Sequence, residues 1–223
     1  MSDLVRDIRE GLHAAGDPPR AAGQQVYMKS AMPFLGVGVP QTRRIARAAA
    51  KGEKDAAVLR RAARDLWDEA AFREERYAAM ALLAVPPASD DLSVTAVIEH
   101  MVRTGQWWDY TDELSHRLAD LHDRHPESTA ELARSWSVDD DMWIRRIAII
   151  SQLGRRDRVD PQLLAGVIAP NVADREFFIR KAIGWALREY ARVAPDWVRG
   201  FADSHALSPL SRREALKHLD PAR

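Results

Sequence analysis

An internal repeat of 35 residues constrains the fold of this chain more than any other feature of its sequence. Four bulky apolar residues stand at this interval: Phe72, Trp107, Met142 and Phe177. Seven places after them come residues that are small or aliphatic, namely Ala79, Leu114, Ile149 and Gly184. A fixed period of about this length is typical of helix pairs that stack into an α-solenoid. We therefore predict an all-α chain with a concave groove suited to an extended polymer, although a helical protein can also show such registers by chance.

Helical patterns fill the chain between and beyond these anchors. Alanine, leucine and arginine are abundant, apolar residues recur at intervals of three and four, and alternating β-branched residues are scarce. Prolines stand where helices are expected to begin, and Asp17, Asp160 and Ser208 precede three of them as candidate caps. No long linker or change of composition interrupts this pattern, so we expect one domain over residues 1–223.

The composition excludes several classes of protein. The 223 residues are 46% hydrophobic and include no cysteine, which rules out disulfides and thiolate metal sites and fits a cytoplasmic location. No apolar run is as long as a membrane span, and we expect no secretory signal. The net charge is zero, but residues 1–140 have 18 basic against 23 acidic residues and residues 141–223 have 15 against 10. The basic half can attract phosphate, although solvated helix faces explain so small a difference equally well.

Asp112 is the leading candidate for chemistry. Asp112 stands five places after the anchor Trp107, and the residues five places after the other three anchors are uncharged. A carboxylate on a packed helix face is costly unless it is paired or used. Trp108 lies one helical turn before it and offers an aromatic face to a cationic group, whereas Trp107 is expected in the core. Asp109 is closer to the expected turn at Gly105, so we predict that Asp109 caps this helix.

A later segment predicts a phosphate-binding surface. Lys181, Trp185 and Arg188 are spaced by four and three residues and therefore share one helix face. Such a face is unusual in a core and common where proteins hold phosphates. Gly184 beside Trp185 would allow another backbone to approach closely.

The segment between these two candidates contains both acidic and basic residues. Three aspartates at 139–141 suit the start of a helix because its dipole favours negative charge there. Arg145 and Arg146 follow among apolar residues, so at least one of them is expected to face a groove, although a surface salt bridge remains possible for either.

Motifs for other chemistries are missing from the sequence. The seven histidines include no His-Glu-x-x-His pair, no glycine-rich phosphate loop with its lysine occurs, and no Ser/His/Asp signature is found. We therefore expect neither a metal nor a cofactor.

The segments described above resemble the DNA alkylation-repair glycosylases of the AlkD type over roughly residues 27–219. The motifs that carry this resemblance are Tyr27-Met28-Lys29 with Phe34-Leu35-Gly36, Trp107-Trp108-Asp109 followed by Asp112, Trp143-x-x-Arg146, Phe177-Phe178-Ile179 through Trp185-x-x-Arg188-Glu189-Tyr190, and Leu210-Ser211-Arg212-Arg213-Glu214-Ala215. The resemblance implies a solenoid of HEAT-like helical repeats. It also implies removal of N3- and N7-alkylated purines from double-stranded DNA by cleavage of the N-glycosidic bond.

The resemblance also implies roles for individual residues. It places the catalytic aspartate on Asp112, the two cleft tryptophans on Trp108 and Trp185, and the cleft arginine on Arg146. We assign DNA contacts to a further set of side chains: Tyr27, Arg43, Arg145, Lys181, Arg188, Arg212 and Arg213. The expected partner is duplex DNA with alkylated purines. We expect the protein to be a monomer that associates with the nucleoid.

The chemistry of such a lesion fits these residue types independently. An N3- or N7-alkylated purine leaves as a neutral base while positive charge moves to the sugar, which a fixed carboxylate stabilises. Asp112 would have this role, and Arg146, Lys181 and Arg188 would hold phosphates. Two alternatives remain open: a non-catalytic helical scaffold that binds DNA or protein, and a chain in which all these features are structural.

Overall fold

The computed structural model of the chain describes residues 2–219, and within them every regular element is a helix. The all-α prediction is therefore confirmed. No helix of this described part is both long and apolar enough to cross a membrane. The α-helices, in chain order, are α1 Asp3–Ala14, α2 Pro18–Met28, α3 Val39–Ala49, α4 Ala56–Asp68, α5 Arg73–Leu82, α6 Val94–Gly105, α7 Trp108–Arg124, α8 Pro126–Trp136, α9 Met142–Ile149, α10 Pro161–Ile168, α11 Phe177–Tyr190, α12 Pro195–Ser204 and α13 Pro209–Leu216. Short 3₁₀ turns are η1 Ala88–Asp90, η2 Arg156–Arg158 and η3 Ala169–Asn171.

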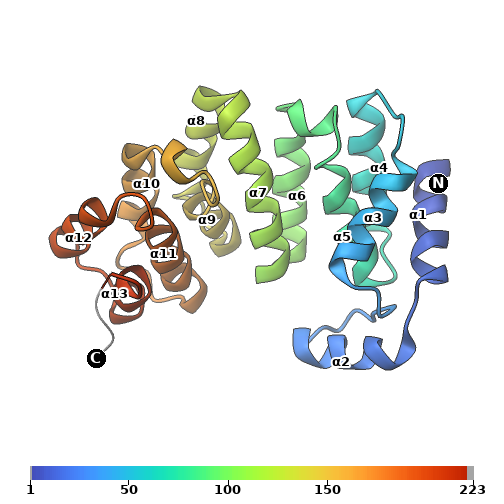
Figure 1. Cartoon of the computed structure of the whole chain (residues 1–223), viewed down its shortest axis with the longest axis horizontal. Helices are drawn as coiled ribbons and strands as arrows, with labels where there is room; N and C mark the ends of the chain where they lie inside the picture. The colour runs from blue at the N-terminus through green and yellow to red at the C-terminus, as the bar shows by residue number, and fades with distance from the viewer. Residues whose placement is uncertain (1, 220–223) are drawn as a thin grey trace. The chain divides into compact units, whose positions relative to one another are not determined.

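The chain divides into two compact units, residues 1–101 and residues 102–223. In the first unit, α3 and α4 pack against α5, and α1 packs against α3, α4 and α5 (Figure 1). Its core holds large side chains that are fully buried, such as Leu12, Leu59, Leu66 and Trp67. The expectation of one domain over the whole chain stays a prediction.

A buried carboxylate organises the loop that precedes α3. Glu74 on α5 is fully buried and accepts hydrogen bonds from the backbone N–H groups of Leu35, Gly36 and Val37 at 2.9, 2.9 and 3.1 Å. These bonds satisfy loop donors that would otherwise be buried without a partner. The glycine-containing loop thus wraps an internal acid of the first unit.

The second unit stacks its helices in succession. α7 packs on α9, α9 on α11, and α11 on α13, with α8, α10 and α12 packed between or beside them (Figure 1). Its core includes Ile150, Ile168, Ile179 and Leu187, all buried. The helices α7, α9 and α11 carry the candidate site residues, so this stacking decides which of them meet.

The 35-residue repeat corresponds to the starts of four helices. Phe72 and Trp107 are the N-cap residues of α5 and α7, and Met142 and Phe177 are the first residues of α9 and α11. The residues seven places later, Ala79, Leu114, Ile149 and Gly184, are all buried. The repeat therefore places equivalent helix faces in the core, as predicted.

Most of the predicted helix starts are confirmed. The side chains of Asp17, Asp160 and Ser208 accept hydrogen bonds from backbone N–H groups in the first turns of α2, α10 and α13. Asp141 caps α9 in the same way. The prediction for Asp109 is wrong, because Trp107 is the N-cap of α7 and Asp109 lies inside its first turn.

Gly184 brings α11 and α13 together. A methyl group at this position would lie 2.5 Å from Cβ of Glu214 and 3.0 Å from the backbone oxygen of Ser211. The hydroxyl of Ser211 also donates a hydrogen bond to the carbonyl of Arg180 at 2.9 Å. The close backbone approach expected at Gly184 is confirmed, and it fixes Glu214 against α11.

We expect Gly184→Ala to destabilise the protein by about 1–3 kcal/mol, because the added methyl group must displace α13. Gly166→Ala in α10 is the matched control, since nothing lies within 4 Å of its added Cβ and alanine favours helices by up to about 1 kcal/mol. Urea unfolding measures both variants. Equal or greater stability of Gly184→Ala would contradict this account of the α11–α13 contact.

Candidate active site

Asp112 and Arg146 form an ion pair between neighbouring repeats. Asp112 is in the second turn of α7, and Arg146 is in α9. The Nε and Nη2 groups of Arg146 donate to the two carboxylate oxygens of Asp112, each at 2.9 Å. The Arg146 side chain is 5% exposed and that of Asp112 is 17% exposed. A paired arrangement of this kind has both strength and a fixed geometry.

Arg146 is held from its other side as well. Its Nη1 donates to the backbone oxygen of Phe178 at 2.6 Å, and its guanidinium carbon lies 5.7 Å from the centre of the Phe178 ring. A guanidinium that is buried and engaged in this way has little capacity for a phosphate. The guanidinium is thus occupied by Asp112 and Phe178, and the role expected for Arg146 as a phosphate contact stays a prediction.

Phe178, which contacts Arg146, belongs to a cluster of three aromatic rings. The rings of Trp143 and Phe178 have centroids 4.9 Å apart, and Trp107 lies 6.4 Å from Trp143 and 6.2 Å from Phe178. Tilted contacts at these separations are favourable for aromatic side chains. Trp107 thus packs among other rings but is half-buried, so it is not a fully buried core residue as expected, whereas Trp108 lines the hollow described next.

A hollow of about 370 Å³ opens beside the carboxylate of Asp112. The residues around it come from α7, α9, α11 and α13: Trp108, Asp112, Arg146, Phe177, Phe178, Lys181, Trp185, Arg188 and Glu214. The structure therefore brings together the four residues expected to be catalytic and the predicted Lys181–Trp185–Arg188 face. The phenylalanines and Glu214 are additional members.

The ion pair leaves the Asp112 carboxylate partly available. A carboxylate has about four lone-pair positions, and Arg146 uses one on each oxygen. Burial raises the pKa of Asp112 to about 6, and nearby Asp109 acts in the same direction, while Arg146 opposes both. The acid therefore becomes fully ionised only above this pH and can accept further contacts from the hollow.

The two cations of α11 share one acid. Lys181 Nζ lies 3.1 Å from Glu214 Oε1, and Arg188 donates a hydrogen bond to Glu214 Oε2. Burial alone would raise the pKa of Glu214, but Lys181 and Arg188 lower it below its usual value. The sequence placed Lys181 and Arg188 on one face but gave no sign of Glu214 as their partner, because it lies 26 residues beyond Arg188 on a different helix.

The other residues assigned to DNA lie outside this hollow. Tyr27 and Arg43 belong to the first unit, where Tyr27 is exposed and Arg43 is half-buried. Arg145 binds Asp174 at 3.0 Å and the carbonyl of Asp139 at 2.7 Å.

The two arginines of α13 also lie away from the hollow. Arg212 binds Asp203 at 2.7 Å and the carbonyl of Ala202, and Arg213 is exposed. DNA contacts by any residue of the assigned set stay predictions.

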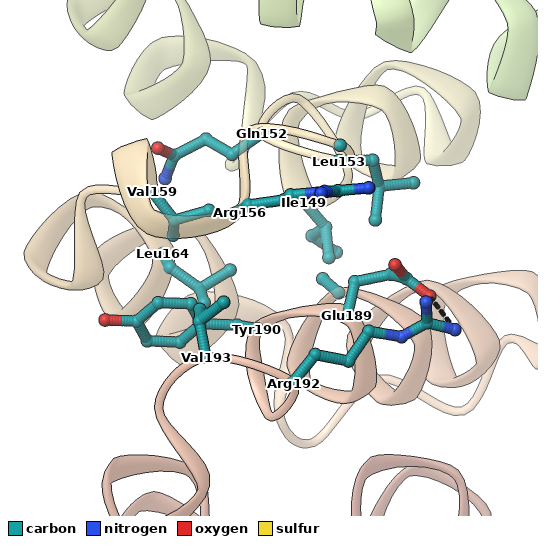
Figure 2. A pocket seen from close by; sticks show the side chains of 12 residues that line it. Ile149, Gln152, Leu153, Arg156, Val159, Leu164, Glu189, Tyr190, Arg192 and Val193 are labelled. Carbon is teal, nitrogen blue, oxygen red and sulfur yellow. Dashed lines mark ion pairs between the residues drawn. The ribbon is translucent and has the colours of Figure 1, made fainter.

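A second hollow, of about 450 Å³, lies elsewhere in the same unit and has a different character. Figure 2 shows its apolar lining, which includes Leu153, Val159 and Leu164, and the ion pair between Glu189 and Arg192 at 3.4 Å. Asp112, Trp108 and Trp185 do not line this second hollow. The smaller hollow combines a paired acid of raised pKa with two tryptophans and is therefore the better candidate for chemistry.

Within residues 2–219, no group of three or more histidine, aspartate or glutamate side chains is arranged to hold a metal ion.

Comparison with known proteins shows which family and which solved structures this chain is similar to. A family model for a DNA alkylation repair enzyme matches residues 8–219, which is nearly the whole chain. A solved structure described as a predicted DNA alkylation repair enzyme from Enterococcus faecalis has a TM-score of 0.83 and 26% identity, and the match covers 93% of this chain and 98% of that chain.

Two structures from Streptococcus mutans share the fold at lower identity. AlkD2 has a TM-score of 0.67 and 17% identity, with 92% of this chain and 99% of that chain covered. The protein smu.31 from strain UA159 has a TM-score of 0.66 and 18% identity, with 82% and 93% covered. No curated protein sequence matches this chain. On the strength of the family match and the helical repeats, the chain belongs to the family of DNA alkylation repair enzymes.

Proposed function

We propose that this protein is a DNA N-glycosylase that removes cationic N3- and N7-alkylated purines, such as 3-methyladenine and 7-methylguanine, from duplex DNA. One observation carries the proposal: a carboxylate with spare lone pairs, fixed by a buried arginine, lines a hollow that also holds two tryptophans. Membership of a DNA alkylation repair family supports the choice of substrate class.

Asp112 would stabilise the charge that develops on the sugar. As the bond between the anomeric carbon and the purine nitrogen breaks, its electron pair goes to the base, which leaves neutral, and the deoxyribose becomes an oxocarbenium-like cation. A fixed anion close to that carbon lowers the barrier without reorganisation during the reaction. The remaining lone pairs of Asp112 can orient the water that then attacks the sugar and accept its proton.

Trp108 and Trp185 would bind the positively charged nucleotide. Both indoles line the hollow that contains Asp112, and the face of an indole attracts cations more strongly than other aromatic rings do. An alkylated purine already carries a positive charge and is a good leaving group, so no strong general acid is required. Two ring faces beside one carboxylate therefore select for a charged lesion and not for an ordinary base.

Arg146 would act through Asp112 rather than on the DNA. Its bonds to both carboxylate oxygens and to the carbonyl of Phe178 fix the acid in one orientation. Phosphates would instead meet Lys181 and Arg188, whose side chains are 38% and 21% exposed at the hollow. This division leaves catalysis to the buried pair and binding to the more exposed cations.

Asp112→Asn should lower the single-turnover rate of 7-methylguanine release at least about a hundredfold, a loss typical of removing one group that stabilises transition-state charge. Binding of the methylated duplex should change little. Asp120→Asn on the same helix is the matched control, because Asp120 pairs with Arg117 at 3.1 Å and does not line the hollow. Full release by Asp112→Asn would refute the assigned role.

The rate of base release should depend on the ionisation of Asp112. Because the carboxylate is the active form and its pKa is about 6, the single-turnover rate should be constant above this pH. Below it, the rate should fall about tenfold per pH unit as the acid becomes protonated. A rate profile that is flat between pH 5 and pH 8 (about one unit below to two above that pKa) would show that Asp112 does not titrate in the rate-limiting step.

Arg146→Gln should separate positioning from binding. Loss of the guanidinium leaves a buried acid without its cation, so the pKa of Asp112 should rise and the acidic limb of the rate profile should move to higher pH. Measurement of the rate profile and of duplex affinity in parallel distinguishes the two roles. Weaker DNA binding with an unmoved profile would instead identify Arg146 as a phosphate contact.

The rival function is a helical scaffold that binds DNA without cleaving it. A wild-type protein that binds methylated duplex but releases no base would favour this rival over the glycosylase.

A further inference from the structure

Glu214 occupies the place where a phosphate would be expected. Its two carboxylate oxygens each contact one of the cations on the predicted phosphate-binding face, with Lys181 on one oxygen and Arg188 on the other. All three side chains line the same hollow as Asp112. A carboxylate that bridges two cations imitates a phosphodiester anion, which presents two charged oxygens in the same way.

The backbone fixes Glu214 in this position. Its Cβ lies where a side chain at position 184 would be, so α13 approaches α11 closely because residue 184 is glycine. The bond from Ser211 to the carbonyl of Arg180 holds the preceding turn of α13 in place. Glu214 is 15% exposed, which is less than either of its partners. Glu214 is therefore held in place in the wall of the hollow by the packing of α13 on α11.

This arrangement has a consequence for DNA binding. A cation that is already paired with an internal carboxylate gains less from a phosphate, because the existing pair must weaken first. Lys181 keeps donors available, since an ammonium has three and Glu214 receives one contact. A phosphate arriving from the open side would thus compete with Glu214 for Lys181 and Arg188.

A positively charged lesion should offset the competition between Glu214 and the phosphate and so favour binding. The hollow holds two acids, Asp112 and Glu214, and both favour a nucleotide that brings its own positive charge. An undamaged duplex brings phosphates alone and therefore experiences the acids as competitors and as a source of repulsion. The same carboxylate can consequently weaken binding of ordinary DNA while tolerating an alkylated site.

We propose that Glu214 is a specificity-determining residue that competes with the DNA backbone for Lys181 and Arg188 and so limits affinity for undamaged duplex. The proposal rests on the proposed function in one respect, namely that this hollow is a surface that meets duplex DNA. It does not require that Asp112 cleaves the glycosidic bond.

The test is a salt titration of binding to a short undamaged duplex by the full-length chain and by Glu214→Gln. Gln has nearly the same size as Glu but no charge, so the ionic pairing with both cations should be lost. Affinity should rise on the order of tenfold at about 50 mM salt, and the slope of log affinity against log salt should steepen by about one to two. A parallel titration with a methylated duplex should show a smaller gain, so that discrimination falls.

Further variants make the result specific. Glu189→Gln on α11 removes the same charge, but Glu189 pairs with Arg192 and does not line this hollow, so its salt slope should equal that of the wild type. In a Lys181→Gln, Arg188→Gln background, Glu214→Gln should have no further effect. Glu214→Asp keeps the charge but withdraws the carboxylate by one methylene, and it provides a second variant if Glu214→Gln unfolds. Its affinity for undamaged duplex should lie between those of the wild type and Glu214→Gln.

The outcomes are distinct. Unchanged or weaker binding by folded Glu214→Gln or Glu214→Asp overturns the proposal, because Glu214 would then be inert or a brace for the two cations. An equal gain in Glu189→Gln also overturns it, since a general charge effect would explain the result. A wild type that releases no methylated base, combined with the predicted salt shift, would refute the glycosylase assignment and leave the role of Glu214 intact.

Discussion

The candidate site depends on one ion pair formed between consecutive repeats. Asp112 and Arg146 occur on successive stacked helices, and their side chains meet because α7 packs on α9. Removing two charges from water is costly, and a pair repays that cost only with good geometry and further hydrogen bonds. The bond from Arg146 to the carbonyl of Phe178 supplies one of them. The pair thus fixes a carboxylate at the edge of a hollow while its pKa stays raised, at about 6.

The surrounding features serve this pair or the hollow beside it. The rings of Trp107, Trp143 and Phe178 pack against one another, and the Phe178 ring also lies against the guanidinium of Arg146. On the other side, the absence of a side chain at Gly184 lets α13 carry Glu214 up to the cations of α11. Acids and cations therefore line the same hollow, and the balance between their charges decides which ligands it favours.

The sequence predicted the repeat and the candidate acid but not the contacts between side chains. Asp112 was identifiable because the equivalent positions in the other repeats are uncharged and, in the structure, buried. The pairing of Arg146 with Asp112 was not identifiable, because a repeat period shows which residues are equivalent but does not show which side chains of neighbouring repeats are in contact. Asp109 was misassigned as a cap, since local spacing gave no sign that the chain enters α7 at Trp107 without a side-chain cap. Glu214 was missed because its contact depends on the packing of α13 on α11.

The central claim is that the carboxylate of Asp112 recognises positive charge on the sugar. The most direct measurement compares affinity for two duplexes, one with a positively charged pyrrolidine in place of a deoxyribose and one with a neutral abasic analogue. An enzyme binds a mimic of its transition state more tightly than a neutral ligand of the same shape. We predict a clear preference for the charged duplex in the wild type and its loss when Asp112 is replaced by asparagine. An equal preference in both proteins would contradict it.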